Sequence, residues 1–439
     1  MVEGHTSTAL TILGKYMGRH KEEKKKPFTF VDLFAGIGGF HQAMRYLNGT
    51  CVLASEIDTD CQNTYRINFP DTRLEGDIAT INPCTIEPYD VLCAGFPCQP
   101  FSKAGYQLGF QDPTKGNMFF HVMTFIHNNP NLKFIILENV RNLADKKDNW
   151  EIVKSELKKE NFLITEEPII LSPHEFGIPQ VRERVYILGI RKDIADSGKL
   201  PYPCIRLKDL YLEEYYKECK PDAALKILQP SEDISDDYLV PSEIVDVLDA
   251  WEEFRINTHL TKIGAPVWIC AFGLGIEEDY VFYYRSGYWR MPRWKQIFYE
   301  KNRALYNANR EFIDMWVEKH HMTDRSKIHQ KFEWNLGQDN VTMKDTIIQI
   351  RQSGIRCKRT NYYPALVAMV NTPIVWDANK NAYRFTTPRE AANMQSFHGR
   401  YHLVGDDKII YRQLGNSVNV RVLKILGERL FELEATEND

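Results

Sequence analysis

Short apolar runs alternate with amphipathic stretches over the first half of the chain. Apolar runs typical of strands occur at residues 28–34, 51–55, 90–94, 133–137 and 185–190. Stretches with helical spacing occur at residues 58–68, 117–127 and 150–159. Because strands and helices alternate along the chain, the pattern predicts an α/β fold with a mostly parallel sheet and helices on both faces.

The regular alternation ends near residue 192. Residues 193–377 hold seven of the eight tryptophans and show no clean period, which indicates a second, irregular domain or a large insertion. The regular pattern returns at Thr387 and ends in a helical stretch at residues 420–433. We therefore expect the two ends of the chain to flank an inserted middle segment.

Composition narrows the class of protein. The 439 residues are 43% hydrophobic and 26% charged, which is typical of a soluble globular protein. No apolar run approaches a membrane span and the N-terminus lacks a signal-peptide core, so we expect a cytoplasmic protein. Nine cysteines without a CxxC pair argue against a disulfide framework and a structural zinc site. We expect no bound metal.

The charge balance restricts how nucleic acid could be bound. With 55 basic and 59 acidic residues the net charge is −4, so any contact with nucleic acid must use local patches. One patch, residues 285–310, mixes arginines and lysines with tryptophans and tyrosines; alternatively it is an amphipathic helix whose aromatic side chains pack in a core. The other is the basic run 351–359, which could equally be a solvated surface loop.

Cys98 is the first candidate for chemistry. It lies in the string Gly-Phe-Pro-Cys-Gln-Pro-Phe-Ser at residues 95–102, just after the apolar run that ends at Ala94. In an open α/β sheet, ligands bind beyond the carboxyl ends of the strands. A free cysteine is usually a small buried hydrophobe, but two flanking prolines and the polar Gln99 and Ser102 favour a nucleophile held on a stiffened loop.

A glycine-rich loop follows the first predicted strand. The string Phe-Ala-Gly-Ile-Gly-Gly at residues 34–39 is suited to a nucleotide or adenosine ligand, although His41 stands where the dinucleotide fingerprint has its third glycine. Glu56 ends the second strand, where a carboxylate can accept from ribose hydroxyls, and Asp77 could accept from an adenine amino group. The alternative for the loop is a plain corner between a strand and a helix.

Two further polar groups follow strands. Glu138, in Glu-Asn-Val at the end of the fourth apolar run, would be partly desolvated and so have a raised pKa; alternatively it caps a helix. Alternation places Gln180, Arg182 and Arg184 on one face of the string Gln-Val-Arg-Glu-Arg, either as a solvated edge or as a clamp for substrate oxygens.

Five of these strings, taken in order, resemble the DNA (cytosine-5)-methyltransferase family. They are residues 32–39, 95–102, 138–140, 180–184 and 413–418, the last reading Gln-Leu-Gly-Asn-Ser-Val. The resemblance covers residues 28–191 and 389 to about 430 and leaves out the middle. It implies a Rossmann-like S-adenosylmethionine-dependent methyltransferase domain with an inserted target-recognition domain.

The resemblance implies a catalytic role for four residues. Cys98 would add as a thiolate to C6 of a flipped-out cytosine, and Glu138 would protonate or hydrogen-bond N3. Arg184 would contact the cytosine O2 atom, and Arg182 would support the loop or a phosphate.

The resemblance also implies which residues bind the cofactor. The S-adenosyl-L-methionine residues would be Phe34, Gly36, Gly38, Glu56, Ile57, Asp77, Ile78, Pro97, Met118, Asn416 and Ser417. Lys115 and Met118 depart from the arginine and leucine usual in the family, which we expect to matter little. In this family the middle segment carries target recognition, and within it we take the basic run as the candidate for groove contacts. The expected DNA contacts are Ser102, Gln180, Arg351, Arg356, Lys358 and Arg359.

The expected organisation and function follow. Residues 1–26 would be an extension, 27–193 the first part of the catalytic domain, 194–385 the target-recognition domain and 386–439 the return to the catalytic domain. We expect a monomeric enzyme that modifies double-stranded DNA in a bacterial or phage restriction-modification system, close to the nucleoid and beside a separate endonuclease. The alternatives are a tRNA cytosine-5 methyltransferase and a non-catalytic DNA-binding relative.

Overall fold

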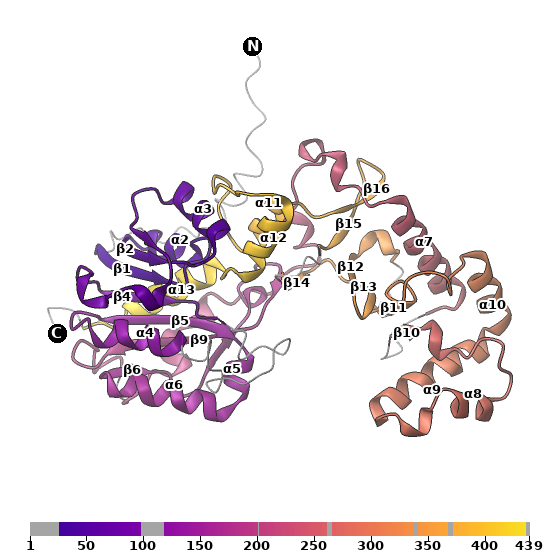
Figure 1. The fold of residues 1–439 in the computed structure, drawn as a ribbon, viewed down its shortest axis with the longest axis horizontal. Coiled ribbons are helices and arrows are strands. Elements are labelled where there is room, and N and C mark those ends of the chain that lie inside the picture. Colours follow the sequence, from indigo (N-terminus) through magenta and orange to yellow (C-terminus); the bar gives the residue numbers. More distant parts are fainter. Residues whose placement is uncertain are drawn as a thin grey trace, which may run out of the picture.

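The computed structural model describes residues 26–97, 118–200, 202–260, 266–337, 341–367 and 372–435, which form two lobes (Figure 1). Both ends of the described chain belong to the first lobe, and the middle of the chain forms the second. The predicted site residues Cys98 and Ser102 lie outside the described ranges.

A mostly parallel sheet forms the centre of the first lobe, as the sequence predicts. Its strands are β1 (Phe28–Leu33), β2 (Gly49–Ser55), β3 (Leu74–Glu75), β4 (Val91–Ala94), β5 (Phe134–Val140), β6 (Phe162–Ile164), β7 (Ile169–Leu171) and β9 (Arg184–Arg191). The order is β3-β2-β1-β4-β5-β9-β6, with β7 also pairing with β9. The strands β1 to β5 are parallel to their neighbours, whereas β9 is antiparallel to β5, β6 and β7.

Helices cover both faces of this sheet (Figure 1). The helices of the first lobe are α2 (Gly39–Arg45), α3 (Thr59–Asn68), α4 (Met118–His127), α5 (Asn142–Asp145), α6 (Lys147–Lys159), α11 (Pro388–Met394), α12 (Asp407–Asn416) and α13 (Val420–Phe431). Alternate side chains of β4 point to opposite faces: Val91 and Cys93 join the core under α2, α3 and α13, whereas Leu92 and Ala94 join the core under α4 and α6. Residues far apart in sequence thus share one core.

The second lobe is more regular than its sequence indicates. Its strands are β10 (Val267–Trp268), β11 (Lys331–Trp334), β12 (Ile347–Arg351), β13 (Gly354–Lys358), β15 (Ile374–Asp377) and β16 (Ala382–Phe385). They form one sheet in the order β10-β11-β13-β12-β15-β16. Its helices are α7 (Ser242–Asn257), α8 (Asp279–Arg285), α9 (Arg293–Ala308) and α10 (Arg310–Lys319). Strands of two to five residues are too short to show a period in the sequence.

The segment after β9 packs on the first lobe before the chain reaches the second. It contains the short 3-10 helices η5 (Leu207–Leu210), η6 (Leu212–Glu214), η7 (Leu225–Ile227), η8 (Ser231–Asp233) and η9 (Asp236–Tyr238). Ile205, Leu210 and Ala224 are buried in the core of the first lobe, whereas the core of the second lobe begins at Val240. The core of the second lobe therefore starts well after residue 194, where the sequence places the boundary.

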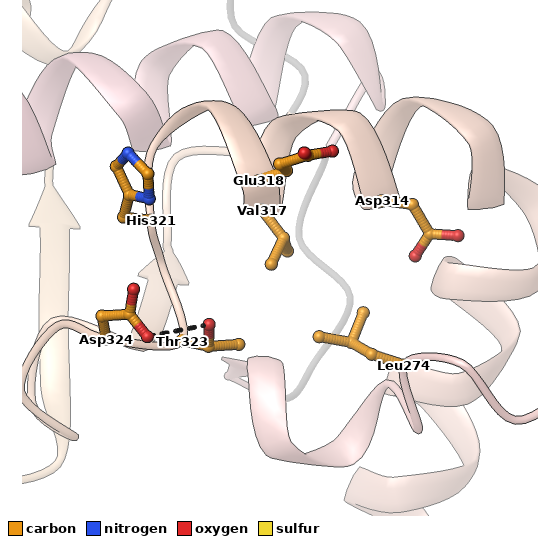
Figure 2. A pocket seen from close by; sticks show the side chains of 7 residues that line it. All are labelled: Leu274, Asp314, Val317, Glu318, His321, Thr323 and Asp324. Atoms are coloured by element: carbon orange, nitrogen blue, oxygen red, sulfur yellow. Dashed lines mark hydrogen bonds between the residues drawn. The ribbon is translucent and has the colours of Figure 1, made fainter.

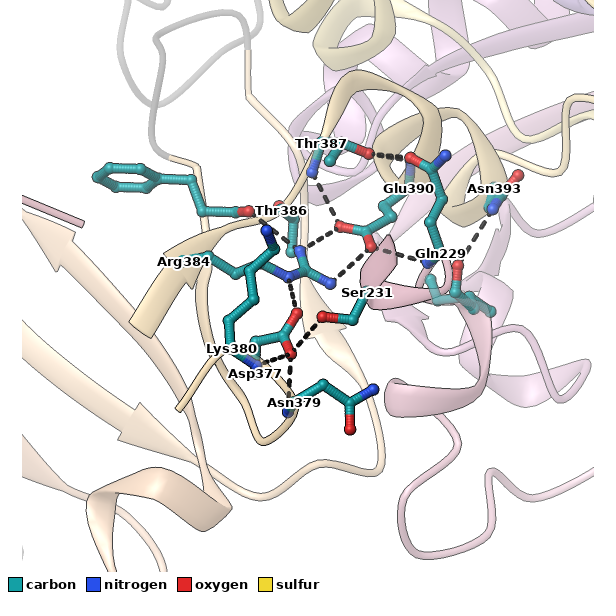
Figure 3. Close-up of polar contacts among 12 residues, drawn as sticks. Gln229, Ser231, Asp377, Asn379, Lys380, Arg384, Thr386, Thr387, Glu390 and Asn393 are labelled. Carbon is teal, nitrogen blue, oxygen red and sulfur yellow. Dashed lines mark hydrogen bonds and ion pairs between the residues drawn. The ribbon is translucent and has the colours of Figure 1, made fainter. Parts of the chain in front are cut away.

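A buried ionic network joins the two lobes (Figure 3). Arg384 of β16 donates to Asp377 of β15 at 3.0 Å and to both carboxylate oxygens of Glu390 in α11 at 2.9 and 3.0 Å. Ser231 donates to Asp377 at 2.7 Å, and the backbone N–H of Gln229 donates to Glu390 at 2.8 Å. The network connects the last strands of the second lobe with the helix that resumes the first.

Replacing Arg384 with methionine is expected to destabilise the protein by about 3–5 kcal/mol, because it leaves two buried carboxylates without their cation. Thermal unfolding of the purified protein measures the effect. The matched control is Lys380→Met, which removes the ion pair of half-buried Lys380 with the exposed Asp236 and should cost less than about 1 kcal/mol. Equal losses in both variants would contradict a stabilising role for the buried network.

No helix within the described ranges is long and apolar enough to cross a lipid bilayer.

Candidate functional site

The glycine loop between β1 and α2 has a backbone conformation that favours glycine. Gly36 and Gly38 have φ values of 56° and 83°, and Phe34 has the left-handed φ of 57° despite its side chain. A Cβ atom on Gly38 would lie 2.3 Å from the Phe69 ring, so this position also needs glycine for space. The conformation of the loop therefore depends on the left-handed backbone of its turn and on the close packing of Gly38 against Phe69.

Glu56, at the end of β2, holds this loop. One of its carboxylate oxygens accepts from the backbone N–H of Gly36 at 2.7 Å, and the other accepts from that of Asp58 at 2.8 Å. Burial raises the pKa of Glu56, and the hydrogen bonds from Asp58 and Gly36 partly oppose this rise. The predicted ribose acceptor thus also positions the glycine loop.

There is open space next to Gly36, and three other predicted cofactor residues follow the ends of β2 and β3. A Cβ atom on Gly36 would meet no atom within 4 Å. Ile57 is 70% exposed, which is unusual for a large apolar side chain at a strand end. Asp77 caps the 3-10 helix η1 (Ile78–Thr80), where its carboxylate accepts from Ala79 at 3.0 Å, and Ile78 is buried behind it. These features fit an adenosine-type ligand whose ring packs against exposed apolar surface.

The end of the chain returns to the same place. A Cβ atom on Gly39 would lie 2.5 Å from Val418 and 3.1 Å from the Ser417 hydroxyl, so residues 417–418 pack against the start of α2. Ser417 is buried and Asn416 is exposed. The structure thereby brings the predicted cofactor residues near position 417 next to the glycine loop. Pro97 and Met118 are half-buried at the two ends of the gap 98–117.

Glu138 and Arg184 form an ion pair at the ends of β5 and β9. The Nε atom of Arg184 lies 2.9 Å from Oε1 of Glu138, and the geometry is that of an ion pair rather than an aligned hydrogen bond. Burial raises the pKa of Glu138, although the positive charges of Arg184 and Arg182 oppose the rise. A glutamate in this setting keeps its proton to a higher pH than an exposed one.

Asn139 anchors the segment that leads to Cys98. Its side-chain N–H donates to the carbonyl of Phe96 at 3.2 Å, and its side-chain oxygen accepts from Val140 at 2.9 Å. A Cβ atom on Gly95 would lie 3.8 Å from the carboxylate of Glu138. The chain therefore leaves β4 directly beside Glu138. Asn139 belongs to the Glu-Asn-Val motif, but its role follows only from these contacts.

Arg182 is buried and holds the site together. It is 3% exposed and donates to the carbonyls of Leu366, Gly415 and Ser417 at 2.7, 3.0 and 2.8 Å. It therefore links the backbone at residue 366 with that at residues 415–417. Its three acceptors come from two segments far away in sequence.

Gln180 is also buried rather than presented at the surface. It lies in the short strand β8 (Gln180–Val181), which pairs with β14 (Tyr363–Pro364) of the segment returning from the second lobe. Within the described ranges its side-chain amide has no hydrogen-bond partner. The predicted alternation holds, since Gln180 and Arg182 point inward and Glu183 points outward.

Tyr401 is a supporting residue that the sequence analysis missed. Its hydroxyl donates to the carbonyl of Ile37 in the glycine loop, although the two residues lie 364 positions apart. Arg389 donates to the carbonyl of Tyr401 and so holds this contact in place. No local signal in the sequence connects Tyr401 with the glycine loop.

The side chains in the run 351–359 that we expect to contact DNA mostly bind other groups of the protein. Arg351 and Arg356 both contact Glu333 of β11, at 3.0 and 2.7 Å, and Arg359 donates to the carbonyl of Leu336 at 3.0 Å. Burial, and then the charges of Arg356 and Arg351, lower the pKa of Lys358. The run forms the hairpin of β12 and β13 rather than a free loop.

A hollow in the second lobe does not suit an anionic ligand (Figure 2). Its volume is about 350 Å³, and it is lined by Leu274, Asp314, Val317, Glu318, His321, Thr323 and Asp324. Three carboxylates in the lining would repel phosphate groups. Asp314 is also engaged, since it accepts from the Tyr306 hydroxyl at 2.8 Å.

Comparisons with known proteins agree with this geometry. Residues 28–262 and 283–432 match the family of C-5 cytosine-specific DNA methylases. The chain is 30% identical to the type II methyltransferase M.AluI of Cellulosimicrobium cellulans, over 90% of each chain. It is 31% identical to the type II methyltransferase M.BanI of Aneurinibacillus aneurinilyticus, over 93% of this chain and 96% of the relative.

A solved structure supports the fold. The Entamoeba histolytica methyltransferase EhMeth superposes with a TM-score of 0.52 at 17% identity, over 93% of this chain and 99% of that chain.

Proposed function

Because the chain belongs to the family of C-5 cytosine-specific DNA methylases, we propose that it modifies cytosine in double-stranded DNA as the methyltransferase of a type II restriction-modification system. The observation that carries this proposal is the buried Glu138–Arg184 pair beside Gly95, on the same sheet edge as the glycine loop. In this proposal the enzyme acts as a monomer, and a separate endonuclease cleaves unmodified DNA.

The cofactor in this proposal is S-adenosyl-L-methionine, which supplies the methyl group when it is bound. The free space at Gly36, the exposed apolar surface of Ile57 and the carboxylates of Glu56 and Asp77 fit its adenosine part. Ser417 and Asn416 complete the site from the other end of the chain.

The protein side chains would act on the cytosine ring. Cys98 would add through its sulfur to C6, which makes C5 electron-rich, and Glu138 would deliver its proton to N3 to absorb the developing negative charge. Arg184 would hold the O2 oxygen and also orient Glu138 through the 2.9 Å contact. Once C5 carries the methyl group, loss of the C5 proton to water would expel the Cys98 sulfur as a thiolate, and return of the N3 proton to Glu138 would restore the ring. The base must leave the duplex to reach these groups.

Methyl transfer from labelled S-adenosylmethionine to unmethylated genomic DNA tests the proposal, with tRNA assayed in parallel. Bisulfite sequencing of the DNA product should show protected cytosines within one short sequence motif. Label in tRNA alone would instead support a tRNA methyltransferase, and no label in either would leave a non-catalytic DNA-binding protein.

Replacing Gly36 with valine is expected to weaken S-adenosylmethionine binding by about 100-fold or more. The branched side chain is strained at a φ of 56° and fills the free space beside the loop. Isothermal titration calorimetry measures the affinity. Gly275→Val is the matched control, because Gly275 also has a positive φ, of 71°, and open space around a Cβ atom, but lies in the second lobe. Unchanged affinity in Gly36→Val would place the cofactor elsewhere.

A further inference from the structure

The far end of the second lobe carries exposed aromatic and basic side chains together. We name as the tip surface the residues Tyr280, Tyr284, Arg285, Trp289, Arg290 and Trp294, which come from α8, the 3-10 helix η11 (Tyr288–Arg290) and the start of α9. In Figure 1, α8 and α9 form the end of the lobe below β10. The four aromatic residues are 57–71% exposed. For residues 285–310 the sequence left open whether the aromatic side chains pack in a core. Trp289 and Trp294 of this patch lie on the surface.

Two arginines of the tip surface have no acidic partner among the described residues. Arg285 and Arg290 are exposed and form no ion pair with any described residue. The first turn of α9 contains Arg293 and Lys295 and no acidic residue, although helix N-termini favour acidic side chains. Arg293 has one acidic partner, Glu300, at 2.8 Å. An anionic partner would satisfy both the arginines and this helix end.

A buried arginine makes the tip rigid. Arg303 of α9 is 1% exposed and donates to the carbonyls of Phe272, Gly273, Ile276 and Glu277. It also pairs with Asp279, at the start of α8, at 2.7 Å. The Tyr288 hydroxyl donates to Glu300, which ties η11 to α9. The exposed rings are thus presented on a fixed scaffold, which lowers the entropy lost on binding.

Other parts of the second lobe are less suited to a polyanion. The arginines of the β12–β13 hairpin share Glu333, and the hollow next to α10 is acidic. The net charge of the whole chain is −4, so DNA would be attracted only by a local patch. Residues 263–282, which include Tyr280, also lie outside the family match.

We propose that the tip surface binds the backbone of duplex DNA, as a contact separate from the site that receives the flipped base. Arg285 and Arg290 pair with phosphates, while Trp289 and Trp294 pack against the sugars and exposed base edges. This inference rests on the proposed function for the identity of the nucleic acid. It assigns DNA binding to a surface outside the hairpin at 351–359.

The test measures binding of the full chain to a mixed-sequence duplex about four helical turns long, by fluorescence anisotropy at several salt concentrations. Arg285→Gln combined with Arg290→Gln should lower the slope of log K against log salt by about two, since each phosphate contact contributes about one. Trp289→Ala combined with Trp294→Ala should weaken binding by about tenfold at constant slope. Arg285→Lys combined with Arg290→Lys should give the wild-type slope, because lysine carries the same positive charge.

The matched control removes two exposed lysines from the first lobe, Lys208→Gln with Lys226→Gln, and should keep the wild-type slope. Wild-type slope and affinity in both tip variants would overturn the inference, while methylation of genomic DNA by the same variants would leave the proposed function standing. The inference would also be overturned if the wild-type protein sediments as a dimer, the tryptophan variant sediments as a monomer, and both bind DNA equally tightly. That result would assign the tip surface to self-association.

Discussion

Replacing Cys98 with serine is expected to abolish methyl transfer, by about 10⁴-fold or more, while DNA binding stays near the wild-type level. A serine hydroxyl at neutral pH is a far weaker nucleophile than a thiolate, so addition to C6 fails even when the base is correctly bound. The assays are methyl transfer from labelled S-adenosylmethionine and anisotropy on the same duplex.

The described neighbours of Cys98 explain why this thiol, and not another, should be the nucleophile. The segment before it is held by the bond from Asn139 to the Phe96 carbonyl, and Gly95 lies beside the Glu138 carboxylate. Cys98 follows Gly95 by three residues in the sequence. Cys93 is fully buried in β4, where burial raises its pKa well above the usual range.

Two measurements separate loss of chemistry from loss of structure. Cys84→Ser changes an exposed cysteine on the same lobe and should keep full activity. In the presence of S-adenosylmethionine, duplex DNA containing 5-fluorocytosine should trap the wild-type protein covalently, because after methyl transfer the fluorine at C5 cannot leave as a cation. The same DNA should fail to trap Cys98→Ser. Methyl transfer or trapping by the serine variant would show that the nucleophile is a different residue.

Replacing Glu138 with glutamine is expected to lower the rate of methyl transfer by about 10²- to 10⁴-fold, because glutamine cannot deliver a proton to N3. Burial raises the pKa of Glu138 above its usual value, so the wild-type residue keeps its proton to a higher pH than an exposed glutamate. The wild-type rate should therefore fall as the pH rises through this pKa, and the variant should lack that fall.

The same substitution should not destabilise the protein at neutral pH. A carboxyl group whose pKa is raised by folding binds its proton more tightly in the folded chain than in the unfolded chain. Its favourable contribution to stability is present below the unfolded pKa and is lost as the pH rises through the folded pKa. At pH values above the folded pKa, ionised Glu138 therefore contributes less to stability than its protonated form does, and the neutral glutamine lacks this loss.

Thermal unfolding at several pH values checks this sign. We expect Glu138→Gln to match or exceed the wild-type melting temperature at neutral pH and to lose the advantage in acid. Arg184→Gln should behave in the opposite way at neutral pH, because it leaves the Glu138 charge without its partner at 2.9 Å. A large loss of stability in Glu138→Gln would mean that the ion pair, rather than proton donation, explains the position of Glu138.

Much of the first lobe could be predicted from local patterns. The run Val91–Ala94 is fully buried in the sheet, as four consecutive apolar residues between polar segments indicate. The glycines at 36 and 38 have the left-handed backbone that a tight turn before a helix requires. These features depend on residues close together in sequence, and the second lobe resisted prediction because its strands are short and its helices carry exposed aromatic side chains.

The sequence by itself determined the alternation of strands and helices, the order of the motifs and the chemical types at the site, because each depends on a few neighbouring residues. Only the tertiary structure decided how these groups act on one another. Arg182 supports the site by donating to carbonyls 184 to 235 positions away. The aromatic side chains of the tip surface are exposed because no other described part of the chain covers them. Contacts over such separations depend on how the whole chain packs, which no local pattern contains.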